Sequence, residues 1–159
     1  MYLTSGCNVG MNGMFWYSDV SNVYLDLSSN SQGITGVDCT EMFYDADLLY
    51  NCYIGNKLFS KIKNANSMFA YSGGRRPSWH LHKAGLYSGE LLDGQMIESA
   101  ERMFSGSTID EIYEIRLGDN LKSMKYFASG CSELGRVTGL YSYLSSGGEF
   151  FSCDKLTYV

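Results

Sequence analysis

The chain has 159 residues, of which 45% are hydrophobic and 18% are charged, and this composition is typical of a folded domain rather than a disordered segment. A net charge of −5 without a basic stripe argues against nucleic-acid binding. No apolar run reaches the ~18 residues that a membrane span requires. Five cysteines without a CxxC pair favour free, buried thiols over disulfides or a zinc site: Cys7, Cys39, Cys52, Cys131 and Cys153.

Along the chain, six copies of one apolar frame recur. Each copy places apolar or small residues at positions i, i+3, i+6 and i+7, as in the run 62–69. This spacing predicts a short α- or 3₁₀-helix with one apolar face. The third positions are 28, 26, 35, 24 and 23 residues apart, which is typical of leucine-rich repeats except for the one long interval. These positions are Met14, Met42, Met68, Met103, Phe127 and Phe150.

A second pattern, in which apolar residues come to alternate with polar ones, follows five of the six copies of the first. It occupies residues 20–27, 48–54, 109–117, 134–140 and 156–159. Alternation of period two predicts a short, half-buried strand. Neither a short helix nor a short strand buries its apolar face alone, so the repeats must stack. We therefore predict an α/β fold: one leucine-rich-repeat solenoid over residues 1–159, with about five to six repeats, short parallel strands on the concave face and short α- or 3₁₀-helices opposite.

The third repeat is irregular, because an insertion at about residues 72–93 lengthens it. The insertion holds the only Pro, both His and a pair of Arg, and insertions in repeats often lie on the binding face. A surface insertion without a role is the alternative. Two His on one side of a strand would be a metal pair, but no third ligand is suitably spaced, so we expect no metal site. The candidate partner-binding residues of the insertion are Arg75, Arg76, Trp79, His80 and His82.

Three sequence motifs point to a known group of repeats. Residues 23–28 read Val-Tyr-Leu-Asp-Leu-Ser, residues 40–43 read Thr-Glu-Met-Phe, and residues 129–134 read Ser-Gly-Cys-Ser-Glu-Leu, with a looser copy at 152–156. This order resembles the Leu-Asp-Leu-Ser strand, Met-Phe helix and Gly-Cys-Ser-x-Leu turn of the BspA-type leucine-rich repeats of bacterial surface proteins, over essentially the whole chain. The resemblance implies a solenoid of bacterial or phage origin, of a family that adheres to proteins.

Alternation along the strands also predicts which side chains point outward. Their mixture of Tyr and charge suits protein recognition, although any repeat of this type places polar residues there. No phosphate loop, GxGxxG, HExxH or GxSxG pattern occurs, so we predict a non-enzymatic protein without a cofactor. The outward residues of the concave face are Tyr24, Asp26, Tyr53, Glu114, Arg116 and Tyr141.

The sequence therefore predicts a recognition module that binds a protein, or in second place a glycan, through the concave strands and the third-repeat loop. Two alternatives stay open: a structural component of a phage virion, phage tail or surface fibre, and a phage-encoded inhibitor of a host protein. The chain stops at Val159 just after a strand, so its uncapped C-terminal edge would support a homodimer or larger assembly. No signal peptide begins the chain, which indicates a cytoplasmic or virion-associated protein unless it is a fragment of a secreted surface protein.

Overall fold

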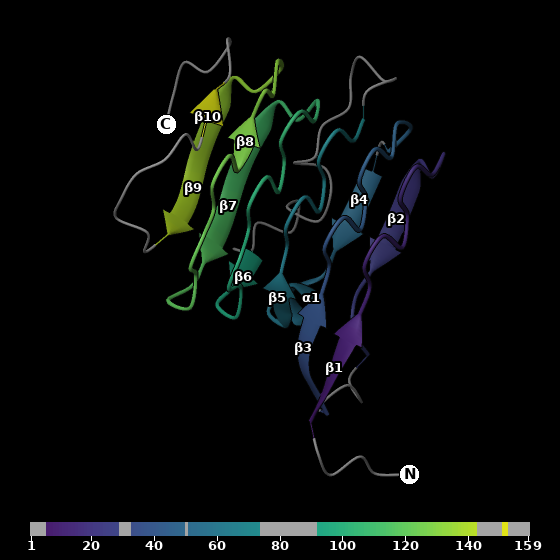
Figure 1. Cartoon of the computed structure of the whole chain (residues 1–159), viewed down its shortest axis with the longest axis vertical. Helices are drawn as coiled ribbons and strands as arrows, with labels where there is room; N and C mark the ends of the chain where they lie inside the picture. The colour runs from purple at the N-terminus through teal and green to yellow at the C-terminus, as the bar shows by residue number, and fades with distance from the viewer. Residues whose placement is uncertain (1–5, 29–32, 50, 74–91, 143–150, 153–159) are drawn as a thin grey trace.

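A computed structural model describes residues 6–28, 33–49, 51–73, 92–142 and 151–152. These residues wind into about four turns of a parallel-strand β-solenoid with little helix. Figure 1 shows the coils following one another across the molecule, from the purple N-terminal side to the yellow C-terminal side. The predicted repeat solenoid is thus confirmed, and most of the last predicted repeat lies outside the described residues. No described helix is long and apolar enough to cross a membrane.

Short parallel strands stack from coil to coil in four sheets. The first sheet contains β1 (Cys7–Gly10), β3 (Ile34–Asp38) and β5 (Ile62–Asn64). The second pairs β2 (Asn22–Leu25) with β4 (Asn51–Ile54). The third contains β6 (Leu92–Gly94), β7 (Glu111–Leu117) and β9 (Arg136–Ser142). The fourth pairs β8 (Ala128–Ser129) with β10 (Phe151–Ser152), and one short helix, α1 (Asn56–Phe59), follows β4.

Strands β2, β4, β7 and β9 lie where the alternating pattern predicts strands. The inward residues Cys52, Ile54, Ile115 and Leu117 are buried, as predicted. The expectation that these strands form one continuous sheet is wrong for the described residues, since they divide into β2–β4 and β6–β7–β9. Between the two sheets, α1 begins one residue after β4 and contacts β6, and residues 74–91, which precede β6, lie outside the described residues.

The five Met-Phe frames that the structure describes are not helical, so the prediction of short α- or 3₁₀-helices is wrong for them. Residues 12–17, 40–45, 66–73, 101–106 and 125–127 form successive turns instead, and we call this stack the turn column. Each level has a pair of residues, four positions apart, at a left-handed φ of +50° to +74°, which an α-helix excludes, and the third level ends on Gly73 at a φ of +77°. The pairs are Gly13 and Tyr17, Glu41 and Asp45, Ser67 and Tyr71, Arg102 and Gly106, and Tyr126 and Gly130.

Hydrogen bonding between coils explains why turns replace helix. The amide of Phe43 donates to the carbonyl of Met68 in the next coil at 2.8 Å, while the amide of Met42 donates to Cys39, three residues back, at 3.1 Å. The same alternation recurs at the other levels. Half of the amides therefore link one coil to the next, as they do in a parallel sheet, whereas a helix would use all of them locally.

Burial in the turn column has the spacing of a helix face. In the second coil the fully buried positions are i, i+3, i+4 and i+7, occupied by Cys39, Met42, Phe43 and Ala46. Successive corners of the turn column are four residues apart, close to the 3.6 residues of one helical turn. The same positions along the chain are therefore buried in both structures. The apolar frame alone could not separate the two structures.

A ladder of phenylalanine rings runs through the core of the solenoid. The centroids of Phe15 and Phe43, and of Phe43 and Phe69, are 5.1 Å apart, and those of Phe69 and Phe104 are 5.5 Å apart. These rings are nearly parallel, within 9°. Phe127 occupies the Met position of its frame and meets Phe104 edge-on, at 87°. Aromatic pairs of this kind each contribute about 0.5–1.5 kcal/mol beyond the burial of their area.

The N-terminal end of the described solenoid leaves core positions open. Met14 is 48% exposed, whereas the equivalent Met42, Met68 and Met103 are fully buried. Phe15 is only partly buried and contacts the core from one side. An apolar end is therefore present here, while the predicted C-terminal edge, at residues 153–159, lies outside the described residues.

Candidate functional site

The outward positions of β2, β4, β6, β7 and β9 form a surface that we call the strand face. Tyr24 and Tyr53 pair in register across β2 and β4, with ring centroids 4.4 Å apart and ring planes 5° apart. Tyr24 is 72% exposed. The predicted outward direction of Tyr24 is thus confirmed, and the structure brings it against the other predicted tyrosine as a stacked pair.

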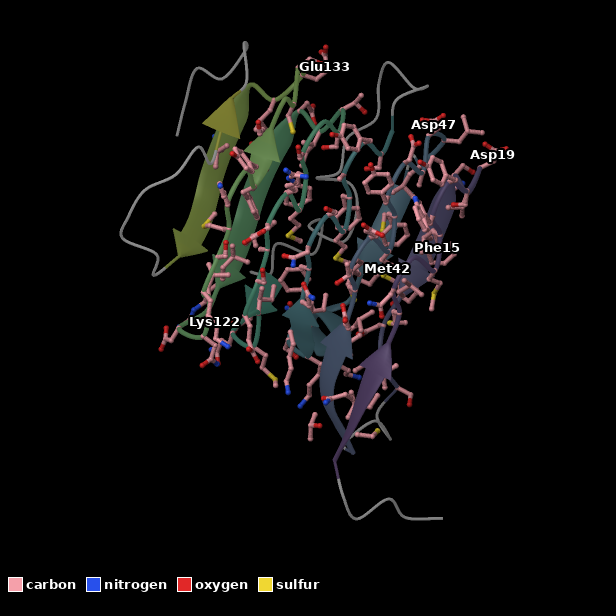
Figure 2. The ribbon with its side chains drawn as sticks, in the orientation of Figure 1. Phe15, Asp19, Met42, Asp47, Lys122 and Glu133 are labelled. Carbon is pink, nitrogen blue, oxygen red and sulfur yellow. The ribbon has the colours of Figure 1, made fainter. Side chains whose placement is uncertain are left out.

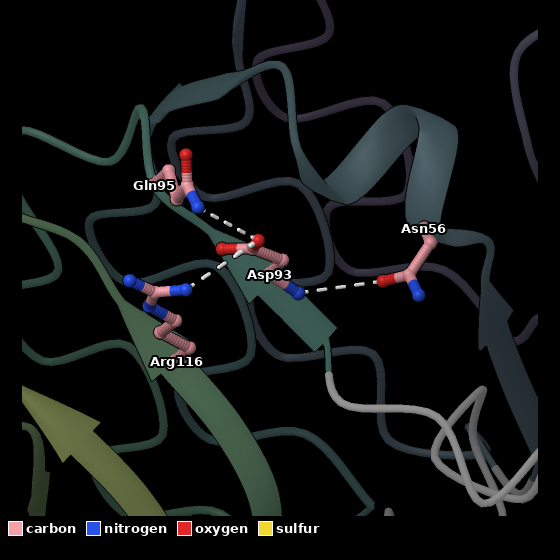
Figure 3. Close-up of polar contacts among 4 residues, drawn as sticks. All are labelled: Asn56, Asp93, Gln95 and Arg116. Atoms are coloured by element: carbon pink, nitrogen blue, oxygen red, sulfur yellow. Dashed lines mark hydrogen bonds and ion pairs between the residues drawn. The ribbon is translucent and has the colours of Figure 1, made fainter.

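Arg116 belongs to a polar cluster at the start of the third sheet, which Figure 3 shows in close-up. Its Nη1 atom lies 4.0 Å from Oδ2 of Asp93, and the side-chain amide of Gln95 donates to the same oxygen at 3.0 Å. The backbone amide of Asp93 donates to Oδ1 of Asn56, in α1, at 3.3 Å. The cluster orients the guanidinium of Arg116 on the strand face and ties the third sheet to the helical turn beside it.

Asp26 points outward as predicted, but its carboxylate has an internal role. Its Oδ1 atom accepts hydrogen bonds from the amides of Leu27 at 2.8 Å and of Leu58, in α1, at 3.0 Å. A Cβ atom at Gly55 would lie 2.1 Å from this carboxyl group, so glycine is required for the close approach. We therefore assign Asp26 to the junction between the first two coils rather than to a binding surface.

The remaining predicted residues are described in part or not at all. The backbones of Glu114 and Tyr141 lie in β7 and β9, and Tyr141 pairs in register with Arg116. The predicted residues of the insertion lie outside the described residues, and these are Arg75, Arg76, Trp79, His80 and His82.

A second aromatic surface lies on the turn column, and strand alternation does not predict it. Exposed fractions are 50% for Trp16, 66% for Tyr17 and 51% for Tyr71. Tyr44 joins them, with its ring centroid 6.1 Å from those of Trp16 and Tyr17 and 5.4 Å from that of Tyr71. The sequence carried a signal for it, since Trp or Tyr follows each of the first three Met-Phe pairs within two residues. We call Trp16, Tyr17, Tyr44 and Tyr71 the aromatic column.

Charge is unevenly distributed along the chain, and the repeat pattern of apolar residues does not reveal this second feature. Residues 1–56 contain six Asp or Glu and no Lys, Arg or His, so all twelve Lys and Arg come later in the chain. Figure 2 shows Asp19 and Asp47 at one end of the coils and Lys122 towards the opposite end. The first two coils are thus both aromatic and anionic on their surface.

The described thiols have the properties of core groups. Cys39 and Cys52 are free and buried, Cys7 is free and half-buried, and the buried thiol of Cys131 donates to the carbonyl of Phe104 at 2.9 Å. Burial, together with the charge of Asp38, raises the pKa of the Cys39 thiol to about 12, and burial raises the pKa of Cys52 as well. A thiol so rarely ionised is a poor nucleophile. No group of three or more His, Cys, Asp or Glu within the described ranges could hold a metal ion.

Comparison of the chain with protein-family models, with curated proteins and with solved structures gives no match. The two surfaces whose chemistry suits binding are the strand face and the aromatic column.

Proposed function

We propose that the chain is a non-enzymatic recognition module of the leucine-rich-repeat type that binds a protein partner through the strand face. The observation that carries this proposal is the stacked pair of Tyr24 and Tyr53, with Tyr24 held 72% exposed. Tyrosine and arginine are enriched among the residues that dominate the binding energy of protein interfaces. Arg116 lies on the same face, and its guanidinium can donate hydrogen bonds to a partner.

The stacking of the two tyrosines supports binding in a second way. Each ring restricts the rotation of the other, because their centroids are only 4.4 Å apart. A side chain that is ordered before the complex forms loses less conformational entropy when the partner arrives. The pair thus forms a preorganised apolar contact on a regular parallel scaffold, which suits a flat or gently curved protein surface.

The test is affinity capture from bacterial lysates with quantitative mass spectrometry, followed by a binding titration with any purified partner. The intact chain is compared with the triple variant Tyr24→Ala/Tyr53→Ala/Arg116→Ala. The matched control is Lys122→Ala, which removes an exposed side chain outside the strand face. Circular dichroism checks that all three proteins fold alike.

We expect one partner to be captured by the intact chain and by the control, and its affinity to fall at least tenfold in the triple variant. Equal affinity for the triple variant would remove the site from the strand face. A chain that captures no protein at all would refute the proposal of a protein-recognition module.

A structural component of a larger assembly is the second candidate, favoured by the open apolar end at Met14. A further coil stacked there would bury this residue as Met42, Met68 and Met103 are buried. Light scattering after size exclusion measures whether the chain self-associates. A concentration-dependent oligomer that Met14→Ser dissociates would support the assembly, whereas a monomer at high concentration would argue against it.

A further inference from the structure

Tyr44 stands at steep angles to the other three rings of the aromatic column, while Trp16 and Tyr17 stack on each other with centroids 5.4 Å apart and ring planes 25° apart. Tyr44 makes interplanar angles of 88° with Trp16, 68° with Tyr17 and 67° with Tyr71. Edge-to-face contact leaves ring faces directed to different sides, and three of the four rings are half or more exposed. The stacked Trp16–Tyr17 pair and Tyr71 lie in the coils on either side of Tyr44, so ring faces on more than one side are open to a ligand. A cation within about 6 Å of a ring face is attracted by the negative charge on that face.

Carboxylates lie close to this group of rings. Burial first, and then the neighbouring hydroxyls of Tyr71 and Tyr17 and the carboxylates of Asp45 and Glu41, raise the pKa of the Tyr44 phenol. Glu41 and Asp45 lie close to Tyr44 in the chain, and Trp16, Tyr17 and Tyr44 belong to residues 1–56, which contain no Lys, Arg or His, so this part of the aromatic column has an excess of negative charge around it. Negative potential and exposed ring faces together favour a positively charged ligand.

The chain itself demonstrates this chemistry further along the turn column. The guanidinium carbon of Arg102 lies 5.5 Å from the ring centroid of Tyr126, and Nζ of Lys125 lies 4.9 Å from it. Both cations and the ring belong to the turn column. In the later coils the turn column thus places cations of the same chain on an aromatic ring, whereas residues 1–56 contain no Lys, Arg or His.

We propose that the aromatic column is a second binding surface, which takes an Arg- or Lys-bearing segment of a polypeptide by cation–π contact and charge attraction. It consists of Trp16, Tyr17, Tyr44 and Tyr71, with the carboxylates of Glu41 and Asp45 near Tyr44. A neutral glycan would use the ring faces alone and gain nothing from the charge, so the charge decides for the cationic peptide. The surface is distinct from the strand face, and its test is independent of the protein-recognition proposal above.

The experiment titrates the full chain by calorimetry with a short peptide of alternating Arg and Gly. The same length of alternating Glu and Gly, and a neutral β-glucan oligosaccharide, are the alternative probes. One variant, Trp16→Ala/Tyr17→Ala, removes ring faces and keeps the charge. A second, Asp19→Asn/Glu41→Gln, removes charge and keeps the rings. Tyr24→Ala is the matched control, because it removes an equally exposed tyrosine from the strand face.

We expect the Arg-Gly peptide to bind, and its affinity to fall about tenfold or more in the ring variant while the Tyr24→Ala control is unchanged. Affinity should also fall in the charge variant and with rising salt, since screening weakens attraction between exposed charges. Equal binding to the ring variant, loss of affinity in the Tyr24→Ala control, or preference for the acidic peptide or the glycan would each overturn the proposal. So would no binding of the Arg-Gly peptide to the intact chain.

Discussion

Replacing Ser67 by Gly should stabilise the protein, and replacing Gly130 by Ala should destabilise it. Ser67 has a φ of +52° and Gly130 a φ of +74°, both in the left-handed region. That region costs a residue with a Cβ atom about 1–2 kcal/mol. Glycine avoids this cost but loses about 0.5–1 kcal/mol more backbone entropy on folding. The net effect is a gain of about 0.5–1 kcal/mol for Ser67→Gly and a similar loss for Gly130→Ala.

Both substitutions isolate the backbone conformation from side-chain contacts. A Cβ atom at Gly130 would have its nearest neighbour at 3.8 Å, so alanine there fits in space and adds only backbone strain. In a helix the signs would reverse, because glycine in a helix interior is about 1 kcal/mol less favourable than alanine. The pair therefore separates the turn column from the helices that the sequence predicts.

The free energy of unfolding is measured by urea denaturation followed by far-ultraviolet circular dichroism. Lys125→Gly is the matched control, since Lys125 lies in the turn column but outside the left-handed positions. It should lose stability in either structure. A destabilised Ser67→Gly together with a stabilised Gly130→Ala would refute the turn column.

Three further outcomes follow from the core and its charges. Phe43→Ala should cost about 3–5 kcal/mol in urea unfolding and more than Phe15→Ala, because Phe43 is fully buried between two rings; an equal cost would contradict the ladder. A maleimide at mildly alkaline pH should label Cys7 in the native protein and Cys39 only after unfolding, as read by mass spectrometry. Burial tends to raise the pKa of Asp38. Hydrogen bonds from Thr40 and from the side chain of Asn12 outweigh this effect and hold the pKa below its ordinary 3.8. Its ionised form therefore stabilises the fold above that pH. This contribution is lost as the pH falls further, so urea midpoints should drop less steeply in acid for Asp38→Asn.

The solenoid and its strands could be predicted from the sequence because both depend on patterns that repeat. Cys52 and Ile54 alternate with Tyr53, and the same alternation recurs in β2. Stacking imposes one burial pattern on every coil, so each copy strengthens the prediction. The division into two sheets does not repeat along the chain, and neither does α1, a four-residue helix that lies beside it. A helix so short has too little periodicity to be recognised.

Only part of the candidate site could be predicted from the sequence, because the rest depends on contacts between coils. The outward position of Tyr24 follows from strand period, but its stacking on Tyr53 depends on register between coils. The internal role of Asp26 depends on Gly55 and Leu58, which lie about thirty residues away in the chain. Contacts between coils cannot be read from the period within one coil, and they decide whether an outward residue is available to a partner.

The turn column shows why a helical spacing was insufficient. Seven of its left-handed positions are occupied by residues other than glycine, such as Glu41, Ser67 and Arg102, so the usual glycine signal of a turn is missing. These residues keep a costly conformation because their amides donate to the next coil and their neighbours fill the core. The turns are therefore stabilised by stacking rather than by local preference. The same stacking brings Tyr44 between Tyr17 and Tyr71, in three successive coils, and so creates a surface that no single repeat contains.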